Sequence, residues 1–91
     1  MIAAVFEASM TRAQAEELAE LMREGHPTRP AGVLSTALLL DGDEARLLAF
    51  WPDQETFERY MASVPAPRGV ELMRKVGVEP TARVVDVLQL G

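Results

Sequence analysis

Apolar residues along the 91-residue chain follow two spacings, one typical of strands and one typical of helices. Short, mainly apolar runs predict strands at residues 2–8, 32–40, 45–51 and 82–90. Between these runs, apolar side chains recur every three or four positions, and that spacing predicts helices because it places them on one helical face. In the first helix they are Ala15, Leu18, Ala19 and Met22, and in the second they are Phe57, Tyr60, Met61 and Val64.

Capping residues mark where the predicted helices begin and end. Thr11 and Gln14 have the spacing of a capping box, and Asp53 is placed to cap the second helix. Gly25 predicts the end of the first helix in a left-handed conformation. Gly77 predicts the end of a third, short helix before the last strand.

The order strand, helix, strand, strand, helix, strand predicts a ferredoxin-like βαββαβ fold of the α+β class. Its four-stranded antiparallel sheet should carry the helices on one face, and Asp41-Gly42 predicts the hairpin between the second and third strands. A chain of this length, with 48% hydrophobic residues, predicts a single domain spanning residues 1–91. Because the strands carry apolar residues on both faces, the face without helices needs a cover. We expect a homodimer that forms through this sheet face.

Composition and charge argue against several partners. The net charge is −5 and the nine Lys and Arg residues are scattered, so nucleic acid is not an expected partner. No apolar run approaches the roughly 20 residues that span a bilayer, so no membrane partner is expected either. The chain has no Cys, no leader-like N-terminus, no glycine-rich phosphate loop and no paired-histidine motif. These features predict a cytoplasmic protein without a metal or nucleotide cofactor.

The run from Phe50 to Met61, FWPDQETFERYM, joins a strand that ends in Trp to an Asp-capped helix with aromatic residues at Phe57 and Tyr60. Together with the element order and the length, this run resembles the antibiotic biosynthesis monooxygenase-like family. The resemblance implies a dimeric α+β barrel with a small-molecule pocket in each subunit, between helices and sheet. It also implies that cofactor-independent oxygenation of a phenolic or other aromatic metabolite is a candidate activity.

Haem-degrading members of that family use an Asn on the first strand together with a Trp and a His around the second helix. The corresponding places here hold Glu7, Tyr60 and Val70, so no imidazole is expected to ligate haem iron and no cofactor is expected. The one histidine, His26, lies in the connector after the first helix. It is either a proton shuttle or, beside Pro27, a solvated loop residue.

Glu7 and Tyr60 are the candidate catalytic residues. A carboxylate among apolar neighbours can act as a base, so Glu7 could remove a proton from a substrate, or it could sit at the end of its strand in water. Tyr60, on the inner face of the second helix, could donate a proton to a substrate oxygen, or it could simply pack in the core.

The candidate substrate-binding residues are Phe6, Trp51, Phe57, Met61 and Arg46. Trp51 could form a flat wall for an aromatic ring, or it could close a small core. Arg46 and Arg83 could neutralise an anionic substrate, or they could form salt bridges, with Asp86 as the expected partner. Either Ser35 or Thr36 could offer a hydroxyl to a pocket, although Thr is an ordinary strand residue.

Two functions follow from these candidates. The first is a homodimer that binds a hydrophobic or aromatic metabolite and acts on it as a cofactor-independent monooxygenase. The second is a non-catalytic ligand-binding or assembly domain. An open pocket with at least two converging polar groups favours the first function, whereas a space filled by side chains favours the second.

Overall fold

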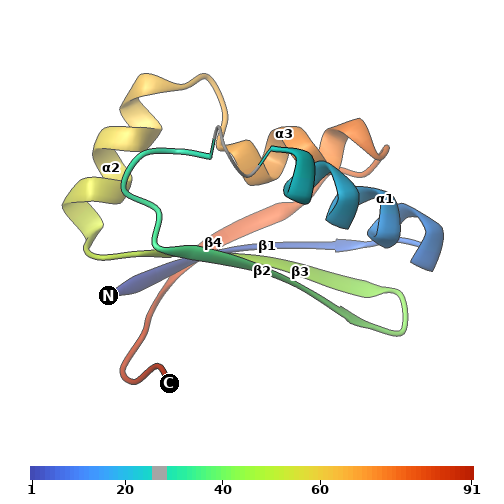
Figure 1. Ribbon diagram of the computed structural model, residues 1–91, viewed down its shortest axis with the longest axis horizontal. Helices are drawn as coiled ribbons and strands as arrows, with labels where there is room; N and C mark the ends of the chain where they lie inside the picture. Colours follow the sequence, from blue (N-terminus) through green and yellow to red (C-terminus); the bar gives the residue numbers. More distant parts are fainter. Residues whose placement is uncertain (26–28) are drawn as a thin grey trace.

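The computed structural model describes residues 1–25 and 29–91, which form a sheet covered on one face by three helices (Figure 1). The sheet is antiparallel throughout, with strand order β2-β3-β1-β4. This arrangement confirms the predicted ferredoxin-like α+β fold. The elements are β1 (Ile2–Ser9), α1 (Arg12–Glu24), β2 (Ser35–Asp41), β3 (Glu44–Trp51), α2 (Gln54–Ser63), α3 (Arg68–Lys75) and β4 (Thr81–Asp86).

Side-chain caps fix the beginnings of the first two helices, as the sequence predicts. The Thr11 hydroxyl accepts a hydrogen bond from the Gln14 amide nitrogen at 3.1 Å, and the Gln14 side-chain oxygen accepts one from the Thr11 amide nitrogen at 2.8 Å. The Asp53 carboxylate accepts a hydrogen bond from the Thr56 amide nitrogen at 2.7 Å. These bonds occupy backbone donors that the first turn of a helix would otherwise leave unpaired.

Two turns show where glycine is used, and one prediction about glycine is wrong. Gly42, the first residue of the β2-β3 turn, has a φ of 62°, and Gly77 after α3 has a φ of 90°. Both values lie in the region that residues with a Cβ avoid. Gly25 at the end of α1 has a φ of −83° instead, so the predicted left-handed cap is absent there.

The two edge strands, β2 and β4, are shorter than predicted. β2 begins at Ser35 rather than at residue 32, because Gly32 turns the chain with a φ of 92°. β4 ends at Asp86, which lies opposite Ile2 of β1. The Val87 amide still donates to the Met1 carbonyl at 3.0 Å, but β1 extends no further and so offers no partner to the residues that follow.

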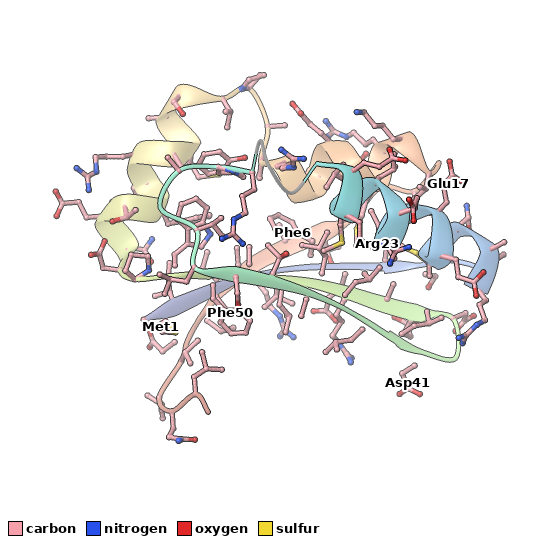
Figure 2. All side chains as sticks on the ribbon, in the orientation of Figure 1. Met1, Phe6, Glu17, Arg23, Asp41 and Phe50 are labelled. Atoms are coloured by element: carbon pink, nitrogen blue, oxygen red, sulfur yellow. The ribbon has the colours of Figure 1, made fainter. Side chains whose placement is uncertain are left out.

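Alternation along β1 and β3 divides their side chains between two faces of the sheet. We call the face beneath the helices the covered face; its residues include Ile2, Ala4, Phe6, Ala45, Leu47, Ala49 and Trp51. We call the opposite face the open face; its residues include Ala3, Val5, Glu7, Arg46, Leu48 and Phe50. Figure 2 shows Phe6 between the sheet and the helices and Phe50 on the other side.

The hydrophobic core lies between the covered face and the helices. Leu18 of α1, Trp51 of β3 and Met73 of α3 are its most completely buried large side chains. No helix in the described part of the chain is both long enough and apolar enough to cross a bilayer. His26 lies outside the described residues.

Candidate functional site

A pocket opens between the covered face of the sheet and the helices. Its cavity volume is about 60 Å³, and the unfilled space is about 590 Å³ when the open mouth is included. Residues from β1, β2, β3, all three helices and the segment before β2 form its wall. The lining residues are Ala4, Phe6, Met22, Gly25, Arg29, Pro30, Val33, Thr36, Leu47, Ala49, Trp51, Phe57, Tyr60, Pro67, Arg68, Gly69 and Leu72.

Aromatic rings build one side of this pocket. The Trp51 ring stacks on Tyr60 with centroids 5.1 Å apart, and it meets Phe57 edge to face at 5.5 Å. Phe57 and Tyr60 are three positions apart on α2, so the helical repeat turns both rings toward the sheet. Trp51 is the last residue of β3 and follows Ala49 on the covered face. The result is a flat, apolar wall suited to an aromatic ligand.

Gly69 allows the first turn of α3 to lie directly against the Phe6 ring. A Cβ at position 69 would be 2.6 Å from the nearest ring carbon of Phe6, which is closer than carbon atoms approach. The absence of a side chain here therefore sets how near α3 comes to the sheet.

The Tyr60 hydroxyl ties α2 to the beginning of α3. It accepts a hydrogen bond from the Arg68 amide nitrogen at 2.7 Å. Pro67, the residue that precedes α3, makes no side-chain cap, so Tyr60 supplies the acceptor that this helix start needs. Burial raises the pKa of the Tyr60 phenol, although the hydrogen bond from Arg68 acts in the opposite direction. Tyr60 therefore stays protonated at neutral pH and retains an O–H that can donate.

The Trp51 indole has an unmet hydrogen-bonding requirement. Trp51 is only 2% exposed, and its Nε1 has no hydrogen-bond partner in the described residues. An indole N–H can only donate, and leaving a buried donor unpaired costs about 1–3 kcal/mol. Less than 1 Å² of this nitrogen is accessible, so a ligand oxygen would relieve the cost only by reaching Nε1 from the pocket that Trp51 lines.

The structure brings together four of the predicted site residues. Phe6, Trp51, Phe57 and Tyr60 all line the pocket. Met61 is half-buried and packs on the hydrophobic core beside them without lining the pocket. The functional roles of these residues stay predictions, but their convergence is a property of the structure.

Glu7 and Arg46 are not brought to this pocket, because both lie on the open face of the sheet. The Glu7 carboxylate pairs with the Arg46 Nε at 3.0 Å and with an Arg83 Nη at 2.9 Å. Glu7 follows Phe6 directly, and the alternation of a strand sends the two side chains to opposite faces. Both arginines thus pair with Glu7 rather than with Asp86, the partner that the sequence suggested.

Arg68 and Arg29 line the pocket, and sequence reasoning did not select them. Arg68 begins a short helix after a Pro-Ala-Pro segment, and Arg29 lies next to Pro30 in a connector. Scattered arginines in such places carry no pattern that distinguishes them from solvated ones. Arg68 reaches the pocket because α3 packs against the end of α1, a contact between distant parts of the chain.

The described residues offer no evident metal site. Within residues 1–25 and 29–91, no three His, Cys, Asp or Glu side chains lie close enough together to hold an ion.

Fold and site together define a ferredoxin-like α+β protein with an aromatic pocket between its sheet and its helices. No protein-family model matches the sequence, and no curated protein matches it. Solved structures do match along nearly the whole chain. One is a monooxygenase from the gene ActVA-Orf6 of Streptomyces coelicolor in complex with Nanaomycin D, with a TM-score of 0.71, 20% identity and coverage of 98% of this chain and 88% of that one.

Two further matches are of the same kind. SnoaB, a cofactor-independent oxygenase from Streptomyces nogalater, has a TM-score of 0.63 at 15% identity and covers 98% of this chain and 94% of its own. A putative antibiotic biosynthesis monooxygenase from Chloroflexus aurantiacus has a TM-score of 0.62 at 20% identity, with coverage of 99% and 96%. These matches confirm the predicted resemblance to antibiotic biosynthesis monooxygenase-like proteins at the level of the fold.

Proposed function

We propose that this protein is a homodimer in which each subunit binds a hydrophobic or aromatic metabolite in the pocket lined by Trp51 and Tyr60. The observation that carries the proposal is the buried Trp51 N–H, which has no partner among the described residues. The rings of Phe57, Tyr60 and Phe6 lie around the same pocket. An aromatic ketone or phenol would bury its ring against this wall and offer an oxygen to the indole.

Calorimetric titration with two matched probes tests this binding. 1-Acetonaphthone has a carbonyl oxygen, and 1-ethylnaphthalene has the same ring system without an acceptor. We expect 1-acetonaphthone to bind about tenfold more tightly, as one additional hydrogen bond to a buried donor allows. Trp51→Phe keeps an aromatic ring but removes the N–H, so it should abolish the difference between the probes. Failure of both probes to bind would contradict the proposed function.

Cofactor-independent oxygenation of the bound metabolite is the second candidate. It is supported by the fold shared with the Streptomyces oxygenases and by the Tyr60 O–H, which could stabilise a developing oxyanion. The described residues that line the pocket include no Asp, Glu or His, so the pocket offers no evident base. Ligand binding is therefore supported more directly than catalysis, and non-catalytic ligand binding is the alternative.

Oxygen uptake with anthrone distinguishes these alternatives. Loss of a proton from the ring methylene gives an enolate, and its carbon forms a bond to dioxygen. The resulting hydroperoxide then breaks its O–O bond and loses water. One dioxygen supplies the new carbonyl oxygen of anthraquinone and the oxygen of the water, so four electrons are transferred in total. Uptake above the uncatalysed rate that falls in Tyr60→Phe supports the oxygenase, whereas binding without uptake supports the non-catalytic role.

Exposed apolar side chains on the open face and in the C-terminal tail support the proposed homodimer. Leu39 is 51% exposed there, and Leu88 in the C-terminal tail is 95% exposed. Figure 1 shows this tail leaving the sheet on the side away from the helices. A second copy would remove these side chains from water, at about 25 cal/mol for each Å² of apolar surface buried.

Sedimentation velocity tests the dimer. We expect the native protein to sediment as a dimer at micromolar concentration, and Phe50→Asp on the open face to sediment as a folded monomer. Ala13→Asp, which adds the same charge on the exposed surface of α1, is the matched control and should remain a dimer. A native protein that is monomeric at this concentration would refute self-association through the sheet.

A further inference from the structure

A second hollow adjoins the pocket between α1 and the edge strand β2. It is an open groove with a volume of about 520 Å³. Its described lining residues are Ala19, Met22, Arg23, Thr36, Ala37 and Leu38. Met22 and Thr36 line the aromatic pocket as well, so the pocket and the groove meet at these two residues.

Three rows of side chains cross the covered face beneath the pocket, because directly opposite residues of paired strands point to the same side of a sheet. Thr36, Ala49 and Ala4 lie opposite one another on β2, β3 and β1 and make the middle row. The two flanking rows consist of larger side chains, namely Leu38, Leu47, Phe6, Trp51 and Ile2. Successive rows are two residues, or about 7 Å, apart along the strands. The middle row therefore forms a shallow trough that runs across the strands between larger neighbours.

The trough leads toward the groove. All three residues of the middle row line the pocket, whereas no residue of β4 is among the described residues of the pocket wall. The pocket therefore extends from β1 toward β2 rather than toward β4. Ala4 and Ala49 are buried at the bottom of the trough, and Thr36 is exposed at its outer end. A ligand that follows the trough passes Thr36 and enters the groove beside α1.

The groove suits an uncharged aliphatic group. Met22 and Leu38 are half-buried and pack against the hydrophobic core, so they offer apolar surface to a ligand. Arg23 is the one charged residue among the described lining residues of the groove, and its Nε donates to the Glu20 carboxylate at 3.1 Å. Because this exposed ion pair already compensates the charge of Arg23, an anionic group would gain little there.

We propose that the ligand is an aromatic ketone with an unbranched aliphatic chain, whose ring occupies the pocket and whose chain follows the trough past Thr36 into the groove. This inference rests on the proposed aromatic-binding function and adds a second subsite to it. A chain that begins at a carbonyl beside Trp51 starts at the border of the trough, because Trp51 and Ala49 are two positions apart on the covered face of β3. The larger side chains on both sides favour an unbranched chain, which needs the least width.

Calorimetric titration with three naphthyl ketones tests the second subsite. 1-Hexanoylnaphthalene extends 1-acetonaphthone by an unbranched chain, and 1-(3,3-dimethylbutanoyl)naphthalene is its isomer with a compact, branched chain. Full burial of one methylene group is worth about fourfold in affinity. Because the groove is open on one side, we expect about twofold for each of the four added methylene groups, or about fifteenfold in total. The branched isomer has the same atoms, yet it should bind no more tightly than 1-acetonaphthone.

A substitution that fills the groove should remove this gain. Ala19 lines the groove but not the pocket, so Ala19→Phe should leave the affinity for 1-acetonaphthone unchanged and reduce that for 1-hexanoylnaphthalene to the same value. Retained binding of 1-acetonaphthone shows that the variant is folded. Ala13→Phe places the same ring on the exposed surface of α1, away from both spaces, and should keep the full gain.

Nuclear magnetic resonance of the methyl-labelled native protein locates the chain without any substitution. We expect 1-hexanoylnaphthalene to shift the signals of the Ala19 and Leu38 methyl groups, because both residues line the groove and neither lines the pocket. 1-Acetonaphthone should shift the Ala4 signal and leave those of Ala19 and Leu38 little changed.

The outcomes separate this inference from the proposed function. If none of the three ketones binds, the aromatic-binding function itself fails. If 1-acetonaphthone binds but the unbranched ketone binds no more tightly than its branched isomer, aromatic binding stands and the second subsite is overturned. A gain that persists in Ala19→Phe, or unchanged Ala19 and Leu38 signals with 1-hexanoylnaphthalene bound, would place the chain elsewhere and overturn the subsite as well.

Discussion

The covered and open faces of the sheet are formed by the same strands, yet they differ in whether their polar side chains have hydrogen-bonding or ion-pair partners. On the open face, Glu7 accepts ion pairs from Arg46 and Arg83 in the adjacent strands. On the covered face, the Trp51 N–H is buried without a partner among residues 1–25 and 29–91. The charged groups Glu7, Arg46 and Arg83 of the open face form ion pairs with one another, whereas the indole N–H of Trp51 on the covered face has no acceptor among the described residues.

This difference supports the proposal that ligand binding and self-association use separate surfaces. A charged cluster whose members already pair contributes little binding energy to a small molecule, because its charges are partly compensated and half-exposed. An unpaired donor beside aromatic rings gains a full hydrogen bond from a ligand oxygen. We therefore propose that the ligand binds between the sheet and the helices and that a second copy binds the open face.

The largest effect that distinguishes the two faces concerns stability. Leu18→Ala leaves a cavity under the helices and should lower the free energy of unfolding by about 2–5 kcal/mol at every protein concentration. Leu39→Ala on the open face should act only through the dimer, so its effect should grow with protein concentration. Denaturant titrations at two concentrations measure both. Equal, concentration-independent losses would remove the distinction between the faces.

A smaller effect is expected where α2 meets α3. Tyr60→Phe keeps the ring stacked on Trp51 but removes the acceptor for the Arg68 amide. We expect a loss of about 0.5–1.5 kcal/mol in the free energy of unfolding, as for one hydrogen bond. Ser63→Ala is the comparison: its exposed hydroxyl donates to the Tyr60 carbonyl oxygen at 2.7 Å, and because this bond is open to water its loss should change stability less. An unchanged stability in Tyr60→Phe would mean that the amide finds another acceptor.

The open-face carboxylate should matter less still. Glu7→Gln removes the partner of two arginines, but these ion pairs are partly exposed, so we expect a change of only about 0–1 kcal/mol. Affinity for 1-acetonaphthone should stay the same, because Glu7 does not line the pocket. If Glu7→Gln abolished anthrone oxidation while binding was retained, the carboxylate would have to act as the predicted base from the other side of the sheet.

The smallest expected effect is a loss of folding stability at low pH. Hydrogen bonds from Thr56 hold the pKa of Asp53 below its ordinary value of 3.8. The stabilisation from the ionised cap is therefore complete above pH 3.8 and is lost as the pH falls through the lower pKa of the folded state. Asp53→Asn keeps an acceptor that does not titrate. Thermal denaturation should show the native protein losing stability faster than Asp53→Asn on acidification below that pH, and parallel curves would contradict this assignment.

The sequence predicted the elements that depend on local signals. The capping box at Thr11, the Asp53 cap and the Gly42 turn are each specified by neighbours within a few residues, and each is present. The strand ends were less predictable, because β4 stops at Asp86, which lies opposite Ile2, the first residue of β1. The end of β4 is thus set by its pairing with β1, and the apolar run from Ala82 to Leu90 contains no signal for it.

The candidate site was predicted only where its residues follow a local pattern. Phe57 and Tyr60 follow the helical repeat, so their shared face could be read directly. Glu7 was selected for its apolar neighbours, but a one-residue difference from Phe6 sends it to the other face. Arg68 depends on a contact with Gly25, 43 residues away along the chain, and no local pattern encodes such a contact.

The most direct test of this account is nuclear magnetic resonance of methyl-labelled protein titrated with 1-acetonaphthone. Ala3 and Ala4 are neighbours on β1, and Leu47 and Leu48 are neighbours on β3, yet each pair is divided between the two faces. Only the covered-face members line the pocket. We predict ligand-induced shifts at the Ala4 and Leu47 methyl groups, with Ala3 and Leu48 little changed. Shifts confined to Ala3 and Leu48 would place the ligand on the open face and contradict the account.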